Sequence, residues 1–345
     1  MSDINIDNKA YKKKILLTGG AGYIGSHVAV ALLESGFDIV IADNLSNSSE
    51  ESLSGIRKIT GRDFSFYNID VCDRSLLVDL FEREELDATI HLAGYKAVGD
   101  AVKSPLKYYR NNIASTTSLL EVMDNYGVRK IILSSSANVY GESSVVPVTE
   151  GCETGNCTNP YGRTKWVQEE MLRDLFTADD RWNIVILRYF NPAGAHESSL
   201  IGEMYGKSPS NIVPSLALAA NGDIPYFRVL GTGYNTPDGT GIRDYIHITD
   251  LANGHVMAIK KLYSQPNVYT YNLGTGRGYS VLETIKAFEK ASGREIPYKI
   301  EAARDGDIAE MYACSDKARE ELGWTAKYGI EDICRSAWNW HNKIY

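Results

Sequence analysis

The sequence predicts an α/β fold, a Rossmann-type doubly wound parallel sheet with a smaller mixed α/β domain after it. Three observations support this prediction. Apolar, strand-like runs alternate with helix-like segments through the first half of the chain. The runs are apolar at nearly every position, as strands covered by helices on both faces are. The first run also ends in a glycine-rich turn directly before a helical pattern.

The strands and helices can be placed in order along the chain. The first run, residues 13–20, is followed at 23–36 by a segment with helical spacing that stops at a glycine. Further apolar runs, bounded by turn residues or charges, lie at 37–44, 63–70, 86–94, 129–136 and 182–190. From Asn191 onward glycine and proline become frequent and the pattern loosens. We therefore predict domains over 11–190 and 191–345, with some segments interleaved.

The composition excludes several classes of protein. The 345 residues contain 36 Lys and Arg against 44 Asp and Glu, a net charge of −8, which argues against a nucleic-acid partner. Five scattered cysteines without CxxC spacing suggest reduced thiols, with neither disulfides nor a metal site. The start lacks a signal peptide, and no apolar run approaches the about 20 residues that span a membrane. We expect a cytoplasmic protein without a membrane partner.

The glycine-rich turn "TGGAGYIG" predicts a dinucleotide site. Gly19, Gly22 and Gly25 follow a predicted strand and open a predicted helix, where bare backbone can approach a pyrophosphate. Without that context the motif would indicate only a tight turn. Asp43 ends the next strand, 18 residues after Gly25, where a carboxylate can bind the adenosine ribose hydroxyls. The carboxylate would repel a 2′-phosphate, so NAD is favoured over NADP.

A second constellation joins serines at a strand end to a tyrosine and a lysine. The run at 129–136 ends in Ser134, Ser135 and Ser136, at the edge where open α/β sheets place their sites. Tyr161 and Lys165 are four residues apart at a predicted helix start, so they share a face. A phenolate there can take a proton from an alcohol if charges lower the phenol pKa from about 10 to about 7, which requires about 4 kcal/mol. The alternative is a surface lysine beside a helix-capping aromatic residue.

These motifs resemble those of the extended short-chain dehydrogenases/reductases and, within them, the UDP-glucose 4-epimerase family. The resemblance runs in order from Lys14 to the C-terminal region. It is carried by these stretches: "TGGAGYIGSH", "ADNLSNS", "HLAGYKAVG", "YYRNN", "SSSANVYG", "NPYGRTK", "LRYFNPAGAH" and "DGTGIRDYIH".

The resemblance implies an activity and an assembly. The expected reaction is reversible epimerisation at C4 of UDP-glucose and UDP-galactose, through a 4-keto intermediate and with tightly bound NAD. The first domain would then bind NAD and the second the UDP-sugar. The helix predicted within 104–127 and the helix that starts at Tyr161 would pair with a second subunit, which gives a homodimer.

The resemblance also implies three sets of site residues. The catalytic set would be Ser136, Tyr161 and Lys165. The NAD contacts would be Gly19, Gly22, Tyr23, Ile24, Gly25, Asp43, Asn44, Asn47, Ser48, Asp70, Val71, Leu92, Ala93, Gly94, Lys96, Asn111, Ser134, Tyr161, Lys165 and Tyr189. The UDP-sugar contacts would be Ser136, Tyr161, Phe190, Asn191, Asn211, Arg243, Arg304, Asp307 and Met311. An acidic protein needs such arginines to bind a diphosphate, although either could also form a surface ion pair.

Three positions depart from the family pattern. Asn138 stands where threonine is common, Leu92 where phenylalanine is frequent, and Met311 where a tyrosine often borders the sugar. Met311 leaves open a UDP-N-acetylglucosamine 4-epimerase, because a slimmer wall leaves room for a 2-acetamido group.

Two further alternatives are a related enzyme and a protein of another class. A nucleotide-sugar 4,6-dehydratase or decarboxylase would need an acidic residue after Ser136, where Ala137 and Asn138 stand. A non-catalytic dinucleotide sensor would not need both Tyr161 and Lys165. We also expect His247 to be a structural histidine in the middle of a strand.

Overall fold

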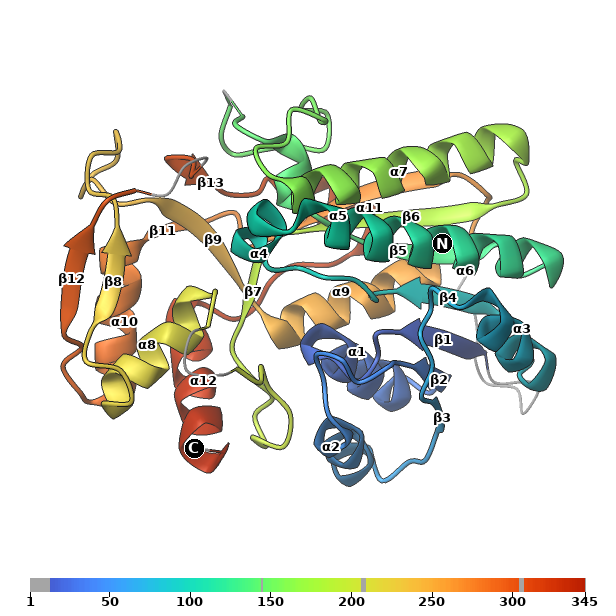
Figure 1. Cartoon of the computed structure of the whole chain (residues 1–345), viewed down its shortest axis with the longest axis horizontal. Helices are drawn as coiled ribbons and strands as arrows, with labels where there is room; N and C mark the ends of the chain where they lie inside the picture. The colour runs from blue at the N-terminus through green and yellow to red at the C-terminus, as the bar shows by residue number, and fades with distance from the viewer. Residues whose placement is uncertain (1–12, 144, 206–208, 304–306, 345) are drawn as a thin grey trace.

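A computed structural model describes residues 13–143, 145–205, 209–303 and 307–344. Its largest part is a seven-stranded sheet in the order β10-β6-β5-β4-β1-β2-β3, with every pair parallel (Figure 1). The strands are β1 (Lys14–Thr18), β2 (Asp38–Ala42), β3 (Ser65–Tyr67), β4 (Ala88–His91), β5 (Lys130–Ser136), β6 (Asn183–Tyr189) and β10 (Val268–Leu273). The predicted α/β class is confirmed, and β1 to β6 lie in the six predicted runs.

The strands are apolar at consecutive positions because helices cover both faces of the sheet (Figure 1). Ile15 and Leu17 of β1 enter one apolar core, and Leu16 between them enters the other. The first core lies under α1 (Tyr23–Glu34), α2 (Glu50–Thr60) and α9 (Ile248–Lys261). The second lies under α3 (Arg74–Arg83), α6 (Ala114–Asn125) and α7 (Pro160–Ala178).

The order of strands reverses between β1 and β4. The chain builds outward from β1 through β2 to β3, then crosses back to β4, β5 and β6. Such a switch point opens a crevice at the carboxyl ends of the strands, where α/β proteins bind ligands. Two later segments of the chain return to this sheet. Strand β10 lies beside β6, and α9 packs against α1. The domain limits 11–190 and 191–345 stay a prediction.

A smaller region contains shorter strands and three helices that pack together (Figure 1). One sheet has the order β11-β9-β13 with β7 also on β9, and β8 pairs with β12. Its strands are β7 (Asn191–Ala193), β8 (Phe227–Leu230), β9 (Ile242–His247), β11 (Gly278–Ser280), β12 (Tyr298–Glu301) and β13 (Glu310–Met311). Its helices are α8 (Ile212–Asn221), α10 (Val281–Ser292) and α12 (Ile330–Ile344).

The helix predicted within 104–127 is interrupted by a wider turn. It consists of α5 (Pro105–Tyr108), a π-helical turn η1 (Tyr109–Ile113) and α6. Such π turns often occur at functional sites, and this one contains the predicted NAD contact Asn111. The remaining short helices are α4 (Val98–Lys103), the 3₁₀ turn η2 (Ala137–Tyr140) and α11 (Asp316–Leu322).

Buried neutral histidines make the stability of this fold sensitive to acid. Burial lowers the pKa of His91 to about 3, and its ring links Thr18 on β1 to Thr116 on α6, with N···O distances of 2.7 and 2.9 Å. The unfolded chain binds the proton near pH 6.5, so stability is lost as pH falls from about 6.5 toward the folded pKa.

We therefore expect the free energy of unfolding to depend less steeply on pH when His91 is replaced by Gln. Between pH 6 and pH 5 the slope should decrease by about 1 kcal/mol per pH unit, because one proton-linked group is lost. Urea unfolding of both proteins at several pH values measures the slopes. Equal slopes in the two folded proteins would contradict a buried neutral His91.

Candidate active site

The turn between β1 and α1 forms a cradle of bare backbone. Gly19 has a φ of 72°, and a Cβ on it would lie 2.8 Å from the backbone nitrogen of Ala93. A Cβ on Gly25 would lie 2.2 Å from the carbonyl oxygen of Gly19. Gly22, the N-cap of α1, has no side chain, so the N–H groups of the first turn remain for a ligand. Together with the positive end of the helix dipole, this cradle fits a pyrophosphate.

Asp43 lies at the end of β2, directly beside the cradle. Its side chain is buried, and Oδ2 accepts a hydrogen bond from the Ala21 backbone nitrogen at 3.0 Å. Oδ1 accepts from the Leu45 nitrogen and the Ser48 hydroxyl, each at 2.9 Å. The carboxylate therefore holds the loop with the predicted NAD contacts Asn44, Asn47 and Ser48 against the glycine turn. This position at the strand edge suits recognition of a ribose.

The next predicted NAD contacts follow β3 and β4. Asp70 accepts a hydrogen bond from the Cys72 backbone nitrogen at 2.9 Å, and Val71 is buried. Asn111 on η1 lies against Cys72, with 3.8 Å between Nδ2 and Sγ. Leu92, Ala93 and Gly94 come directly after β4, and Gly94 has a φ of 155°.

Asn112 is a residue of this region that the sequence reasoning missed. It is fully buried, and its Nδ2 donates to the Tyr95 carbonyl at 3.1 Å and to the Thr164 hydroxyl at 3.0 Å. It thereby ties the loop after β4 to α7. Its position next to Asn111 in "YYRNN" was the available signal.

Helix α7 begins so that Tyr161 and Lys165 face the end of β5. The N-cap Asn159 accepts a hydrogen bond from the Gly162 nitrogen at 2.8 Å, and Pro160 occupies the first helical position. Lys165 is 4% exposed and its Nζ donates to the Ser134 carbonyl at 2.7 Å. Ser136 ends β5, and its hydroxyl lies near enough to the phenol of Tyr161 to lower the phenol pKa. The structure therefore brings the predicted catalytic residues together.

Burial dominates the electrostatics of this set when the protein groups are taken alone. Burial raises the pKa of Tyr161 to about 12, and the hydrogen bond with Ser136 opposes that change. Burial also lowers the pKa of Lys165 to about 8, against the attraction of Glu169. The expected value near 7 for the phenol is therefore not reached by these protein groups, because desolvation of the phenolate outweighs them. A further positive charge is required beside the phenol.

Asn138, one of the three departures from the family pattern, contacts Ser136 directly. Its Nδ2 donates to Ser136 Oγ at 3.0 Å, and its Oδ1 accepts from Asn159 Nδ2 at 3.0 Å. Asn159 in turn caps α7. A chain of hydrogen bonds therefore connects the serine to the start of the helix that carries Tyr161.

Tyr189, at the end of β6, extends this group on the far side of Ser134. Its hydroxyl lies 2.6 Å from Nε2 of the buried His255. Burial raises the pKa of Tyr189, and a hydrogen bond with Ser134 opposes the rise. The phenol therefore stays neutral and can act as a hydrogen-bond partner.

Four of the predicted UDP-sugar contacts, Phe190, Asn191, Arg243 and Met311, lie directly after β6 or in β7, β9 and β13. Phe190 and Met311 are buried in one apolar cluster, and Asn191 begins β7. The guanidinium of Arg243 donates to the carbonyls of Ile242 and Ile308, each at 2.8 Å.

Two other predicted contacts fall at a gap in the described chain. Arg304 lies outside the described residues, whereas Asp307 is the first described residue after the gap and is partly buried. Next to Met311, Tyr312 packs near Gly278 instead of joining the cluster of Phe190.

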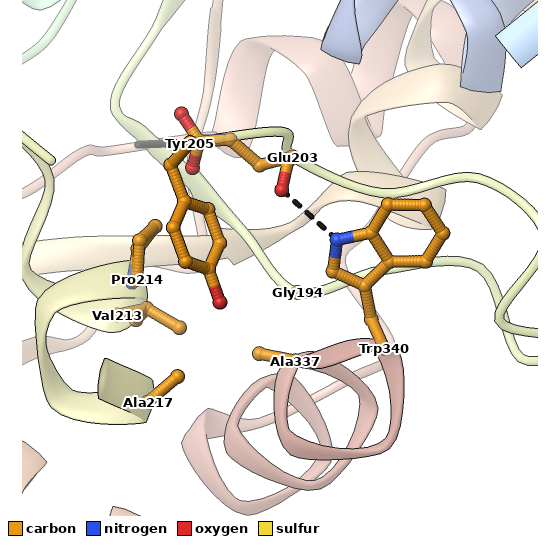
Figure 2. Close-up of a pocket in the computed structure, with 8 residues that line it drawn as sticks. All are labelled: Gly194, Glu203, Tyr205, Val213, Pro214, Ala217, Ala337 and Trp340. Atoms are coloured by element: carbon orange, nitrogen blue, oxygen red, sulfur yellow. Dashed lines mark hydrogen bonds between the residues drawn. The ribbon is translucent and has the colours of Figure 1, made fainter. Parts of the chain in front are cut away.

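Glu203 connects a predicted NAD contact to a predicted substrate contact. Its Oε1 accepts from Lys96 Nζ at 2.8 Å and from Asn211 Nδ2 at 2.7 Å. Trp340 on α12 donates to the Glu203 carbonyl at 2.9 Å (Figure 2). Sequence reasoning missed Glu203, because the residues that it joins are far apart in the chain. Figure 2 shows the pocket next to this contact, lined by Gly194, Glu203, Tyr205, Val213, Pro214, Ala217, Ala337 and Trp340.

His247 is structural in its contacts, although the expected position in mid-strand is wrong. It is the last residue of β9 and the N-cap of α9, where its ring accepts from the Thr249 nitrogen at 3.1 Å. Across the described ranges no helix is long and apolar enough to cross a membrane. The same residues contain no group of three or more His, Cys, Asp or Glu arranged to hold a metal ion.

Comparisons with known proteins agree with this geometry. Residues 15–274 match the model of the NAD dependent epimerase/dehydratase family. The chain is 53% identical to the UDP-glucose 4-epimerase of Bacillus subtilis over 95% of this chain and 96% of that protein. It is 50% identical to the mouse UDP-glucose 4-epimerase over 96% of this chain and 97% of that protein.

A solved structure, UDP-glucose 4-epimerase from Bifidobacterium longum in complex with NAD⁺ and UDP, superposes with a TM-score of 0.94. It is 50% identical to this chain and covers 96% of it, and this chain covers 99% of that structure. These matches confirm the resemblance that the motifs indicate. The chain belongs to the NAD dependent epimerase/dehydratase family.

Proposed function

We propose that this chain catalyses the reversible epimerisation of UDP-glucose and UDP-galactose at C4, with NAD as a tightly bound cofactor. The observation that carries the proposal is the convergence of Ser136, Tyr161 and buried Lys165 at the sheet edge that also holds the glycine cradle and Asp43. The similarity to UDP-glucose 4-epimerases over nearly the whole chain supports the same reaction.

The protein groups perform the proton transfers of this reaction. Tyr161 takes the proton from the sugar 4-hydroxyl, and Ser136, oriented by Asn138, holds the reacting oxygen. Bound NAD⁺ supplies the hydride acceptor, and its positive nicotinamide supplies the charge that lowers the phenol pKa. Lys165, held by the Ser134 carbonyl, adds a second positive charge on the same side. Tyr161 returns the proton when hydride comes back to C4, so the reaction has no net redox change.

Inversion at C4 requires that the 4-keto sugar turns while the nucleotide stays in place. We assign the anchoring to Arg243, whose guanidinium is fixed by two backbone carbonyls, and to Arg304. A guanidinium fork fits diphosphate oxygens and gives an acidic protein the local positive charge it needs. Phe190 and Met311 then form an apolar wall beside the sugar, against which the keto sugar can rotate without new hydrogen bonds.

The other candidate reactions fit the site less well. A 4,6-dehydratase or decarboxylase needs an acid after Ser136, but Asn138 is a neutral amide whose hydrogen bonds go to Ser136 and Asn159. A non-catalytic dinucleotide sensor has no use for a buried ammonium aimed at the sheet edge beside a phenol. The cost of burying Lys165 favours an enzyme.

We propose a cytoplasmic homodimer. Five free thiols agree with a reducing compartment. The apolar side chains Val98, Val102 and Leu106 on α4 and α5 are 37%, 59% and 81% exposed, and both helices adjoin α7. Leu106 lies in the helix predicted within 104–127, and α4 extends its apolar surface beyond the predicted helices. This stripe supports pairing at this side of the molecule, because a second copy would remove it from water.

Replacing Tyr161 by Phe should lower kcat about 10²–10⁴-fold, because the proton acceptor is lost. Binding of UDP to the NAD-loaded protein should change by less than about twofold, since Tyr161 acts at the sugar. Turnover of UDP-galactose and UDP titration calorimetry measure the two effects. Tyr126→Phe, an exposed tyrosine, is the control. Near-full turnover by Tyr161→Phe would rule out the assigned base.

Replacing Met311 by Tyr should make the enzyme more selective for UDP-galactose over UDP-N-acetylgalactosamine. A ring at this buried position takes up space beside the sugar, so kcat/KM for UDP-N-acetylgalactosamine should fall about tenfold relative to that for UDP-galactose. Met311→Leu keeps the volume and should leave the ratio within about threefold. An unchanged ratio in folded Met311→Tyr would show that residue 311 does not border the sugar.

Light scattering at micromolar concentration should give the mass of a dimer. Val102→Glu/Leu106→Glu should shift the protein toward monomer, because charges would enter the paired face. The control is Ile300→Glu on β12, a residue that is 61% exposed and lies in the smaller region. A monomeric wild type, or a dimer that survives the double substitution, would contradict the assigned face.

A further inference from the structure

The buried face of α7 is polar beneath the catalytic residues. Tyr161, Lys165 and Glu169 follow one another at intervals of four residues, so they lie along one side of the helix. Glu169 is fully buried, and Gln168 beside it is also fully buried. A carboxylate is rarely buried completely unless it is paired, because desolvation costs several kcal/mol. The residues that bind the Glu169 carboxylate therefore indicate its role.

Glu169 is held by two strands. Its Oε1 accepts from the Ser135 hydroxyl at 2.5 Å and from Arg188 Nε at 3.0 Å, and its Oε2 accepts from Arg188 Nη2 at 2.6 Å. Ser135 on β5 and Arg188 on β6 are direct neighbours in the sheet. Arg173, on the outer side of α7, lies 3.6 Å from Oε2. The carboxylate is thus fixed in position by charge-assisted hydrogen bonds.

The arginine is fixed as well. Arg188 Nη1 donates to the Tyr140 hydroxyl at 2.9 Å, and that hydroxyl donates to Asn272 Oδ1 at 2.7 Å. The guanidinium also lies 4.8 Å from the centre of the Tyr140 ring. This network reaches from α7 across β5 and β6 to β10. Glu169 can therefore neither rotate away nor exchange its partners without breaking several buried contacts.

The three consecutive serines of β5 each contact a different turn of α7. The Ser136 hydroxyl lies near Tyr161 and lowers the pKa of its phenol, the Ser134 carbonyl accepts from Lys165, and the Ser135 hydroxyl donates to Glu169. The reaction described above uses the first two contacts only. The third contact also joins a serine of β5 to a residue of α7, one helical turn deeper in the protein.

We propose that Glu169 is a positioning residue for the reaction: its carboxylate, fixed by Ser135 and Arg188 one helical turn below Lys165, keeps Lys165 an ammonium ion at the edge where Tyr161 reacts. This inference rests on the proposed function. Glu169 touches neither the substrate nor Tyr161, and it acts through Lys165 alone.

The charges around Lys165 explain why the carboxylate is needed. Burial lowers the pKa of Lys165 to about 8, and the Glu169 carboxylate opposes that loss of charge. His91 faces Lys165 from β4, and burial lowers its pKa to about 3, so it is neutral at pH 7. Tyr161 lies one turn before it on the same helix, and Arg188 on β6 is ion-paired with Glu169. Among these groups, Glu169 alone is an anion that can hold the proton on Lys165 at neutral pH.

The test is the pH dependence of kcat for Glu169→Gln, which keeps the shape of the side chain and removes its charge. Without the carboxylate, Lys165 loses its proton at lower pH, so the alkaline limb of kcat should move down by about one pH unit. The acid limb should move up by less than that, because Lys165 is only partly deprotonated at the pH where the phenol ionises. KM should change by less than about twofold, since the substitution removes no contact that binds the ground state and the transition state of the substrate equally.

The matched control is Glu170→Gln. Its side chain is 47% exposed and pairs with Arg173 on the outer face of α7, so the same charge is removed one residue away. This variant should keep the wild-type profile. An unchanged profile in folded Glu169→Gln, or an equal shift in both variants, would overturn the proposal.

Two further measurements keep the test decisive. If Glu169→Gln does not fold, Glu169→Met/Arg188→Met replaces the buried pair by apolar side chains, which cores often tolerate, and should show the same shift. Phenolate absorbance of each NAD-loaded protein, minus that of its Tyr161→Phe derivative, reports the phenol directly and should titrate at higher pH without Glu169. A wild type that does not epimerise UDP-galactose would defeat the proposed function, whereas an unshifted phenol would defeat the role of Glu169.

Discussion

The rest of the active site depends on the burial of one ammonium group, that of Lys165. Lys165 can be 4% exposed only because its charge is met by the Ser134 carbonyl and by Glu169. The first contact requires α7 to lie directly on β5, since a lysine that donates to Ser134 at 2.7 Å leaves no room for water between them. The proline and the asparagine cap fix the start of α7, and therefore which of its residues face β5.

The same parallel sheet serves two chemically different sites. On the β2 side of the switch point, backbone N–H groups and Asp43 form a region suited to phosphates and a ribose. On the β5 and β6 side, hydroxyls, a phenol and a buried cation form a region suited to proton transfer. The loop after β4 lies between them, and Asn112 fastens it to α7. A movement of α7 would therefore change the geometry of both sites.

Local patterns predicted much of this structure. Strand runs, the glycine turn and the spacing of Tyr161 and Lys165 depend on neighbouring residues, and they are where the sequence placed them. Contacts between distant segments were not predictable in this way, which is why Asn112, Glu203 and the Glu169–Arg188 pair escaped notice. The rise in the pKa of Tyr161 on burial could not be predicted either, because desolvation depends on everything packed around a group and not on its nearest charges.

The late return of the chain to β10 has a consequence for how the protein is made. Until Val268–Leu273 leaves the ribosome, β6 is the edge of the sheet, with a row of unpaired backbone groups and apolar side chains that are all buried in the finished protein. Translation from Tyr189 to Val268 lasts roughly 4–16 s at typical rates. During that interval the nascent chain exposes β6 as an unpaired, aggregation-prone edge strand. We therefore expect chaperones to be needed most at this stage of synthesis, and not while the ends of the chain emerge.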